Sequence, residues 1–319
     1  MATDISTFSS TIAVVVTYNP PPGLFDRICT IREQAPVILI DNGSRPNGLE
    51  QLHTCAKLAL GIIELGRNVG IAAALNTGIA RARELGAEYV WTFDHDSVPL
   101  PGCRQHLEAV LDAPAWCDAC AAVPVVQYED PHIRCRWPSS SLASLRRPVR
   151  LVYADALTMP TVVDLAIQSG MLIRASDFEH SGGFDEALFI DLVDTEWCLR
   201  MRLKHDRLVV ASPSANIAHS LGDVRRVTIK WLGLELFPTH HASLRHWFIA
   251  RNRILLWRRY AMSNPSWALY ELLGGLKLTG KVLLCERGRT KKMKATLNGT
   301  LSGVIAAARD LRRETEDDS

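Results

Sequence analysis

Short apolar runs recur at regular intervals along the first part of the chain. Residues 11–17 (TIAVVVT) are an unbroken, β-branched run, which is typical of a strand buried on both faces of a parallel sheet. Similar runs predict strands at residues 36–40 (PVILI), 61–65 (GIIEL) and 88–93 (EYVWTF). Segments of helical character lie between them at residues 24–34, 49–60 and 71–85. This alternation predicts an α/β domain with a mostly parallel, doubly wound central sheet flanked by helices.

The pattern changes after residue 96. Residues 124–150 are rich in Pro, Arg and Ser and are predicted to be a loop region. The elements predicted further on are strand–turn–strand at 162–174, a turn and a helix at 184–203, a short strand at 208–211, and mainly helix from residue 243. The 319 residues suffice for one large domain with an appendage, or for two modest domains.

Charge is spread unevenly along the chain. The formal net charge is only +2, so the composition does not indicate a nucleic-acid partner. Residues 277–294, however, contain seven basic residues and one acid, Glu286, which gives this segment a net charge of +6. Leucines interleave with these charges, so an amphipathic helical appendage is expected. A contact with an anionic membrane surface, a homo-oligomer contact and a solvated helix remain open alternatives.

The N-terminal residues, the lengths of the apolar runs and the cysteines predict the cellular compartment. Residues 1–10 lack the basic start and apolar stretch of a signal peptide, and no run of 18 uncharged apolar residues occurs. The eight cysteines include one CxxC, at residues 117–120, without a second pair or a histidine cluster at zinc-binding spacing. These features predict reduced thiols and a cytoplasmic protein, peripheral on the inner face of the membrane if the basic segment binds lipid.

Polar residues follow the ends of all four predicted strands. They are Thr17, Tyr18 and Asn19, then Asp41 and Asn42, then Asn68, and finally Asp94 and Asp96. Ligands of doubly wound sheets gather beyond the carboxyl ends of the strands, whereas Asn and Asp also end strands for purely structural reasons. Four successive ends of this kind favour a ligand site.

Asp94 and Asp96 are two residues apart, so on an extended chain both carboxylates point the same way and His95 points away. Hard oxygen ligands of this kind suit Mg²⁺ or Mn²⁺ held together with substrate phosphates. Such a metal would act as a Lewis acid on a departing nucleoside diphosphate.

Further candidate residues lie downstream. Asp194 and Glu196 lead into a predicted helix, where acids also serve as caps; Asp194 is the candidate general base for an acceptor hydroxyl. His219 could complete the metal shell or contact the diphosphate. Arg251, on a predicted helix, has the paired donors that match phosphate geometry.

These stretches resemble the inverting nucleotide-sugar transferases of glycosyltransferase family 2, which have the GT-A (Rossmann-like) fold, and more closely the bacterial rhamnosyltransferases that use dTDP-L-rhamnose. The matching segments are residues 15–20, 40–44, 68–72, 93–97, 169–173, 182–186, 190–198, 219–222 and 251–253. One departure is His95, where these enzymes usually carry glutamine. The resemblance covers residues 11–258, and it implies a catalytic domain at 1–260 and a basic helical region at 261–319.

The resemblance also implies roles for individual residues. The nucleotide-sugar donor, expected to be dTDP-L-rhamnose, would be bound by Thr17, Tyr18, Asn19, Asp41, Asn42, Asn68, Gly70, Asp94 and Arg251. Asp94, Asp96 and His219 would hold the metal. Gly170, Asp191, Glu196 and Trp197 would bind a saccharide or lipid-linked saccharide acceptor, and Asp194 would be the base.

Three alternatives remain beside this expectation. The donor could be another UDP- or GDP-sugar. A sugar nucleotidyltransferase would need a basic, glycine-rich loop after the first strand, and residues 18–23 (YNPPPG) contain neither Lys nor Arg. A non-catalytic binding protein of the same fold would have no need of Asp94, Asp96 and Asp194.

Overall fold

The computed structural model describes residues 10–317, apart from 129, 131, 140–148, 220–226, 230–233 and 237–240. The chain divides into two compact units, which are described separately. The first unit contains Met1–Ser139, Leu151–Phe189 and Val193–Ser220. The second contains Ser140–Arg150, Ile190–Leu192 and Leu221–Ser319.

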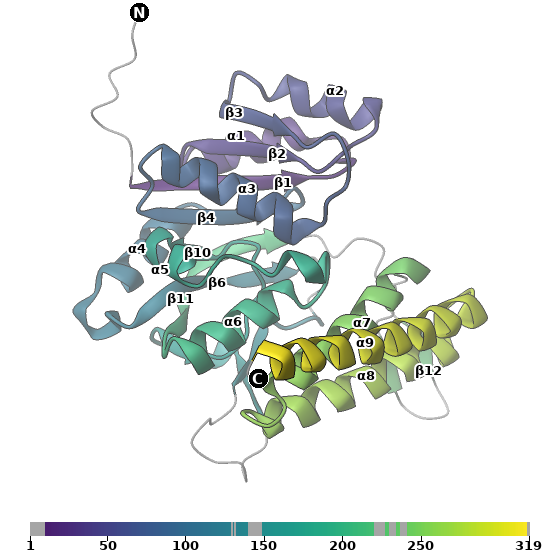
Figure 1. Ribbon diagram of the computed structural model, residues 1–319. Helices are drawn as coiled ribbons and strands as arrows, with labels where there is room; N and C mark the ends of the chain where they lie inside the picture. Colours follow the sequence, from purple (N-terminus) through teal and green to yellow (C-terminus); the bar gives the residue numbers. More distant parts are fainter. Residues whose placement is uncertain are drawn as a thin grey trace, which may run out of the picture. The chain divides into compact units, whose positions relative to one another are not determined.

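The first unit is built around a sheet in which nine strands are described (Figure 1). The strand order is β3-β2-β1-β4-β10-β6-β11-β5, and β9 pairs with β11. The first four strands of the chain are β1 (Thr11–Thr17), β2 (Val37–Asp41), β3 (Ala59–Glu64) and β4 (Tyr89–Asp94). They pair in parallel, and every residue of β1 and β2 is buried, as the unbroken apolar runs predict.

Three helices connect these parallel strands. They are α1 (Leu24–Arg32), α2 (Pro46–Thr54) and α3 (Ile71–Glu84). Figure 1 shows α3 on one face of the sheet and α1 on the other, as right-handed crossovers in this strand order require. Gly78 lets α3 lie directly on the sheet, because a Cβ at this position would be 2.3 Å from Val14 Cγ1. The predicted α/β architecture is therefore confirmed, although α2 ends at Thr54, earlier than predicted.

The second half of the sheet adds antiparallel pairings. Its strands are β5 (Ser97–Pro99), β6 (Ala119–Tyr128), β9 (Thr161–Val163), β10 (Leu172–Arg174) and β11 (Leu208–His219). The helices here are α4 (Cys103–Asp112), α5 (Ala175–His180) and α6 (Val193–Lys204), with short 3-10 turns η2 (Pro114–Trp116), η3 (Ala154–Ala156) and η4 (Glu186–Leu188). Strands β7 (Arg136–Ser139) and β8 (Arg150–Tyr153) form a separate two-stranded ribbon.

Two sequence-based predictions in this half are wrong. The loop predicted over residues 124–150 contains the end of β6, all of β7 and the first residue of β8, and the strand predicted at 208–211 runs to His219. The reason is that β11 pairs in parallel with β6 along its length, with irregular register around Ser212, so tertiary pairing extends both strands through polar sequence.

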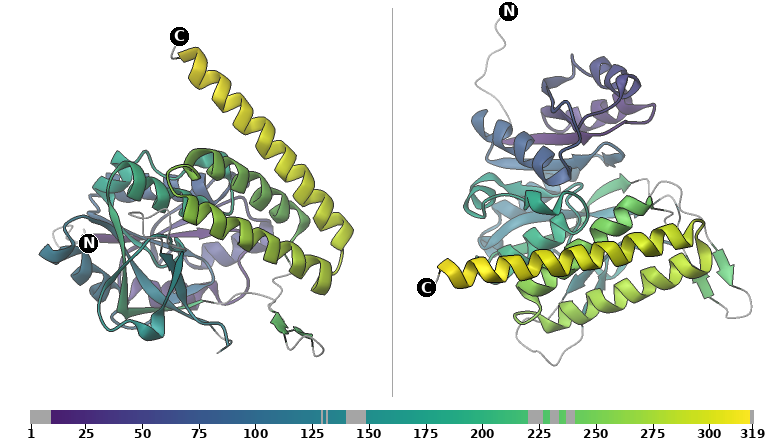
Figure 2. Two further views of the ribbon diagram at one scale, coloured as in Figure 1. Left: turned by 90° about the horizontal axis from the view of Figure 1, so that it is seen from below. Right: turned by 45° about the vertical axis from the view of Figure 1, so that its right-hand side comes forward.

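The second unit is mainly helical. It contains α7 (Ser243–Tyr260), α8 (Pro265–Cys285) and α9 (Arg289–Asp317), and a small ribbon of β12 (Val227–Ile229) and β13 (Leu234–Leu236). Figure 2 shows the three helices lying along one another. Asn264 caps α8 by accepting a hydrogen bond from Trp267 N at 3.1 Å. None of the described helices combines the length and the apolarity needed to cross a bilayer.

Helix α7 packs tightly against α9 in this unit, where a Cβ at Gly299 would be 2.2 Å from Trp247 O. The compact units therefore assign α7 to the helical part of the chain. A catalytic domain ending at residue 260 remains a prediction about function, since Arg251 of α7 is one of its candidate residues.

Substituting Gly78 tests the close packing of α3 on the sheet. Gly78→Ala should lower the free energy of unfolding by ~1–3 kcal/mol, because the added methyl group overpacks the contact with Val14. Urea unfolding followed by circular dichroism measures this change. Gly61→Ala is the matched control, since no atom lies within 4 Å of a Cβ there; equal stabilities of the two variants would contradict the packing argument.

Candidate functional site

The parallel register places several predicted site residues at one edge of the sheet. Thr17 pairs with Asp41, and Val16 pairs with Asp94, so β1, β2 and β4 end side by side. Asp41 is 1% exposed. Its Oδ2 accepts hydrogen bonds from Gly43 N at 3.0 Å and Ser44 N at 2.8 Å. Asp41 therefore shapes the turn after β2.

Three asparagines bind the loops at this edge to one another. Asn19 Oδ1 accepts from Arg45 N at 2.9 Å, and Asn42 Oδ1 accepts from Val69 N at 2.8 Å. Asn68 Oδ1 accepts from Gly70 N at 3.0 Å within its own turn. The loops after β1, β2 and β3 thus form one connected surface. The sequence predicted these side chains as direct nucleotide contacts, and the structure uses their amide oxygens to hold the backbone.

Tyr18 and Thr17 differ in exposure at the same edge. Tyr18 is 45% exposed, which leaves its ring available to a planar ligand. Thr17 is buried, and its Oγ1 lies 3.3 Å from Asp41 Oδ1. The exposed Tyr18 is therefore suited to stacking on a base, and the buried Thr17 is suited to holding Asp41 in place.

Gly70 joins this surface to the segment before α6. Ile71 N donates to Phe189 O at 2.7 Å, and a Cβ on Gly70 would lie 2.6 Å from the same oxygen. The φ of Gly70 is 90°, which side chains rarely adopt. A side chain at position 70 would therefore separate the start of α3 from Phe189.

The segment Asp94–His95–Asp96 forms a tight turn between β4 and β5. The prediction of an extended chain through Asp96 is therefore wrong, because β5 folds back and pairs with β11. Arg27 Nε donates to His95 O at 2.8 Å and fixes this turn from α1. Burial lowers the pKa of His95, against the opposing effect of the Asp96 carboxylate.

Asp94 is held by the loop before β10. Its Oδ1 accepts from Gln168 Nε2 at 2.7 Å, and its backbone N donates to Ser169 Oγ at 3.0 Å. Gln168 and Ser169 are both buried. The orientation of Asp94 is thus set by two side chains from a distant part of the sequence.

Asp96 and His219 lie next to each other beyond Asp94. Asp96 Oδ1 is 3.5 Å from His219 Nδ1, and this oxygen is buried without a hydrogen-bond partner in the described part of the chain. Ser169 Oγ donates to Ser97 Oγ at 2.7 Å, and Ser97 Oγ is 2.7 Å from His219 Nδ1. This chain of hydrogen bonds connects the turn at Asp94 with the end of β11.

The contacts of Asp96 bear on the predicted metal site. A buried oxygen without a partner is costly, and a cation is one of the ways to satisfy it. Asp96 therefore fits the requirement of a Mg²⁺ or Mn²⁺ ligand. Among the described residues, however, no group of three His, Cys, Asp or Glu side chains forms a ready-made metal site. A metal held here would need substrate phosphates or water to complete its shell.

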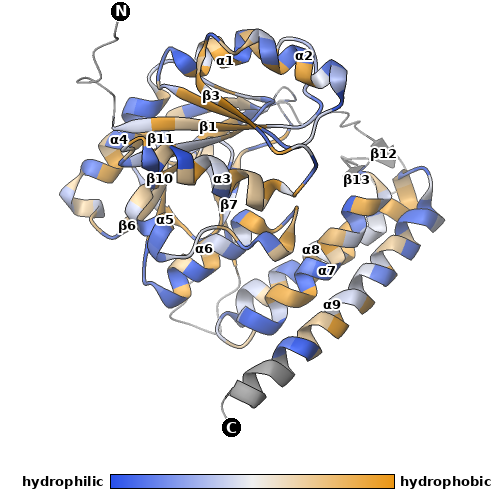
Figure 3. Cartoon of the chain, turned by 45° about the horizontal axis from the view of Figure 1, so that its top comes forward, coloured by the Kyte–Doolittle hydropathy of each residue, from blue (hydrophilic) through white to orange (hydrophobic). Residues whose placement is uncertain are grey.

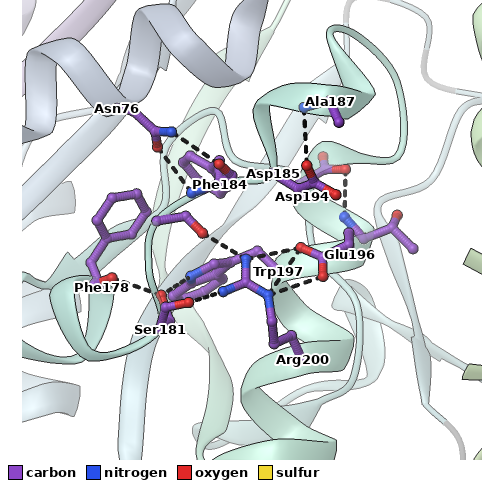
Figure 4. A network of polar contacts seen from close by, with 12 residues as sticks. Asn76, Phe178, Ser181, Phe184, Asp185, Ala187, Asp194, Glu196, Trp197 and Arg200 are labelled. Atoms are coloured by element: carbon purple, nitrogen blue, oxygen red, sulfur yellow. Dashed lines mark hydrogen bonds and ion pairs between the residues drawn. The ribbon is translucent and has the colours of Figure 1, made fainter. Parts of the chain in front are cut away.

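Asp194 lies in the first turn of α6, and its Oδ1 accepts from Thr195 N at 2.7 Å (Figure 4). In the same view Glu196 is paired with Arg200, whose Nη2 lies 2.9 Å from Glu196 Oε2. Arg200 Nη2 also donates to Gly183 O at 2.6 Å. Glu196 therefore binds the helix to the preceding loop.

Trp197 has no exposed surface. Its Nε1 donates to Ser181 Oγ at 3.1 Å, and its ring packs against Phe178 and Phe184. The geometry gives Trp197 and Glu196 roles in positioning α6 and does not support the predicted direct contact with an acceptor.

Gly170 is also buried, behind the turn at Asp94. Its N donates to Thr92 O at 2.7 Å, and its O accepts from Trp91 Nε1 at 2.9 Å. Gly170 therefore sets the course of the backbone that carries Gln168 and Ser169.

Asp191 and Arg251 belong to the second unit. Asp191 is paired with Arg245, whose Nη2 is 2.8 Å from Asp191 Oδ1. Arg251 Nη1 donates to Asn252 Oδ1 at 3.1 Å, and Asn252 Nδ2 donates to the carbonyls of Ile190 and Asp191 at 2.8 and 3.0 Å. The predicted diphosphate-binding Arg251 thus shares a hydrogen-bond network with the predicted acceptor residue Asp191.

The backbone around Asp191 is strained. Phe189, Asp191 and Leu192 have φ values of 66°, 62° and 61°, which are uncommon for residues with side chains. Strain of this kind is concentrated at functional sites in proteins, where the surroundings enforce it. Here it immediately precedes Asp194 in the sequence.

Sequence reasoning missed Gln168, Ser169 and Ser97 as site residues, and it missed Arg200. The only signal was the turn-forming sequence Gln168–Ser169–Gly170. The contacts of Gln168 and Ser169 with Asp94 join residues more than 70 positions apart, so no local pattern reveals them.

Acidic side chains and cross-linked loops at the carboxyl edge of a parallel α/β sheet are the arrangement of a nucleotide-binding enzyme. The chain matches the family model "Glycosyl transferase family 2" over residues 12–182. It is 31% identical over 301 residues to the dTDP-rhamnosyl transferase RfbF of Shigella flexneri, covering 93% of this chain and 96% of that protein. The chain therefore belongs to glycosyltransferase family 2 and is a glycosyltransferase.

Two further comparisons agree with this assignment. The N-acetylglucosaminyl-diphospho-decaprenol L-rhamnosyltransferase of Mycobacterium tuberculosis is 29% identical over 233 residues, covering 65% of this chain and 74% of that one. The crystal structure of S. aureus TarS 1–349 superposes with a TM-score of 0.57 at 12% identity, covering 92% of this chain and 80% of that chain. The latter likeness shows the GT-A fold.

Replacing Ser169 tests the hydrogen-bond chain behind Asp94. Ser169→Ala should lower the free energy of unfolding by ~1–3 kcal/mol, because it leaves Asp94 N without this acceptor and removes the donor to the buried Ser97. Urea unfolding measures the loss. Ser214→Ala, at an exposed position, is the control. A Ser169→Ala variant as stable as this control would show that the chain of hydrogen bonds does not stabilise the site.

Proposed function

We propose that this glycosyltransferase is an inverting, metal-dependent enzyme that transfers L-rhamnose from dTDP-L-rhamnose to a saccharide or lipid-linked saccharide acceptor, in the synthesis of a bacterial surface polysaccharide. The observation that carries the chemistry is Asp96 Oδ1, which is buried without a hydrogen-bond partner among the described residues, in the turn that begins at Asp94 where β1, β2 and β4 end. The sugar is proposed from the relatives, since both named above are called rhamnosyl transferases.

The nucleotide would lie on the connected loops after β1, β2 and β3. Tyr18 is exposed and offers a ring face to the base, whereas Asp41, Asn42 and Asn68 keep the loop backbones in position. Because Gly70 has no side chain, the start of α3 can approach Phe189 closely. In this proposal the exposed Tyr18 contacts the nucleotide, whereas the polar side chains of the turns hold the loops in place and need not contact it.

The leaving diphosphate would lie beside Asp94 and Asp96. A bound Mg²⁺ or Mn²⁺, held by Asp96 with Asp94, would supply Lewis-acid stabilisation of the departing phosphate oxygens. His219 has two roles open to it, as a third ligand or as a hydrogen-bond donor to the diphosphate. Because Ser97 Oγ accepts a hydrogen from Ser169, its own hydrogen can go to His219 Nδ1, which leaves a proton on Nε2 for the second role.

Asp194 is proposed as the general base. It would take the proton from an acceptor hydroxyl while the oxygen attacks the anomeric carbon of the sugar and the bond to the diphosphate breaks. Attack from the face opposite the leaving group inverts the configuration at that carbon. The pair of Glu196 and Arg200 fixes α6, so that Asp194 is presented from a rigid helix end.

The class of acceptor is proposed from a relative. The name of the Mycobacterium tuberculosis relative describes a lipid-linked acceptor for that enzyme, and we propose the same class here. A donor other than dTDP-L-rhamnose, such as a UDP- or GDP-sugar, is the competing proposal, because no described contact reads the sugar itself.

Donor choice and metal dependence are tested by thermal unfolding with a panel of nucleotide sugars. dTDP-L-rhamnose with Mg²⁺ or Mn²⁺ should raise the melting temperature more than UDP- or GDP-sugars, since binding to the folded state stabilises it by mass action. In Asp96→Asn the additional shift caused by metal should disappear. A panel that gives neither a shift nor donor hydrolysis in the presence of metal would rule the proposal out, and a larger shift with a UDP- or GDP-sugar would favour the competing donor.

The base is tested by Asp194→Asn. This variant should lose ~10²–10⁴-fold in kcat while donor protection against thermal unfolding is kept, because the amide cannot accept the hydroxyl proton. Asp185→Asn is the control, because the Asp185 carboxylate accepts from Ala187 N at 3.0 Å and caps η4 (Figure 4). If Asp194→Asn turned over as fast as the control, the base would have to be sought elsewhere.

A further inference from the structure

We infer that the exposed leucine face of α8 is a docking surface for an anionic phospholipid membrane, with the helix lying in the plane of the interface. This face belongs to the second unit alone, and its docking does not require the proposed donor or acceptor. If the acceptor is lipid-linked, such docking would also bring the enzyme to the surface that carries its substrate.

The leucine face consists of six leucines that are exposed although they lie within a regular helix. They are Leu269, Leu272, Leu273, Leu276, Leu283 and Leu284, with exposures between 41% and 62%. Figure 3 shows apolar residues along α8. Exposed apolar side chains are common singly, whereas a contiguous group of this size indicates an interaction site.

The leucines occupy one side of the helix. At 100° per residue they fall within an arc of about 120°, with Gly280 in the same arc. Glu271 lies on the opposite side and contacts Arg253 of α7, with Arg253 Nε 3.2 Å from Glu271 Oε2. Trp267 and Val282 are the buried residues of α8. The helix therefore uses one side for its own unit and presents the leucines on the other.

Basic residues flank the leucine face. At 100° per residue Lys277 lies about 20° and Lys281 about 60° beyond one edge of the arc. The next basic residues toward α9 are the exposed Arg287, Arg289, Lys291 and Lys294. The structure removes one charge from the basic patch that the sequence suggested, because Lys292 is buried and paired with the buried Glu286. An apolar face with cationic edges matches the hydrocarbon boundary and phosphate layer of an anionic membrane.

The same charges disfavour a second copy of the chain as the occupant. A two-fold symmetric contact through this face would bring equivalent basic residues of the two copies toward one another. Like charges that face each other across an interface are destabilising. A membrane rich in anionic headgroups instead neutralises them, so one partner accounts for both the leucines and the charges.

Vesicle co-sedimentation of the full chain tests this inference. Binding should be strong to vesicles of phosphatidylcholine with phosphatidylglycerol, weaker to phosphatidylcholine alone, and reduced by salt. The double substitution Leu273→Gln and Leu276→Gln should weaken partitioning by at least about tenfold, since each change removes apolar area from the interface. Lys277→Gln with Arg287→Gln should reduce binding to the anionic vesicles only.

The matched control is Leu60→Gln with Leu85→Gln, two leucines of the first unit that are 43% and 41% exposed. This control should bind vesicles as the unchanged protein does, and all variants should keep their melting temperatures and donor-dependent thermal shifts. These readouts are independent of sugar transfer, so a failure of the proposed reaction would not affect them.

Two results would overturn the inference. One is the absence of binding to anionic vesicles at low salt by the full chain. The other is a leucine variant that binds like the control, and a dimer in light scattering that this variant dissociates would then assign the face to a second copy.

Discussion

The parallel register of β1 with β2 and β4 is the constraint on which the rest of the site depends. It sets the ends of these strands at one edge, so the turn at Asp41 and the turn at Asp94–Asp96 lie beside the loop after β1. The register is maintained by burial of both faces of β1 and β2 and by the close approach of α3 at Gly78. A shift of the register by one residue would turn each side chain of the strand to the opposite face of the sheet. The site residues at this edge would then no longer lie together.

The antiparallel half of the sheet supplies the remaining residues of the candidate site. The loop before β10 supplies Gln168 and Ser169, which orient Asp94, and β5 with β11 brings Ser97 to His219. Each polar group in this chain is buried or nearly so, where an unmet hydrogen bond is expensive. These hydrogen bonds hold the site together before any ligand arrives, and Asp96 Oδ1 and Gln168 Oε1 are two of its buried oxygens that lack a hydrogen-bond partner among the described residues. Preorganisation of this kind suits the proposed binding of a highly charged diphosphate.

The helical unit has an interior that is held by specific contacts and an exposed leucine face. Its buried ion pair of Glu286 with Lys292 and the capped start of α8 hold the helices together, whereas the leucine face has no such contacts in the described structure. A family 2 glycosyltransferase that acts on a membrane-bound acceptor would need a catalytic sheet and a surface that contacts the lipid. The proposed docking helix would provide the second, and none of the described helices is long and apolar enough to cross a bilayer.

The sequence by itself determined the parallel half of the fold, because buried strands and amphipathic helices leave their periodicity in consecutive residues. It also indicated Asp94, Asp96 and Asp194 as candidates, since acids at strand and helix ends stand out locally. Only the tertiary structure decided how these residues are used. It folded Asp94–Asp96 into a turn, placed Trp197 in the core, paired Glu196 with Arg200, and revealed Gln168 and Ser169. These outcomes depend on hydrogen bonds and packing between distant segments, and such contacts have no signature in the spacing of neighbouring residues.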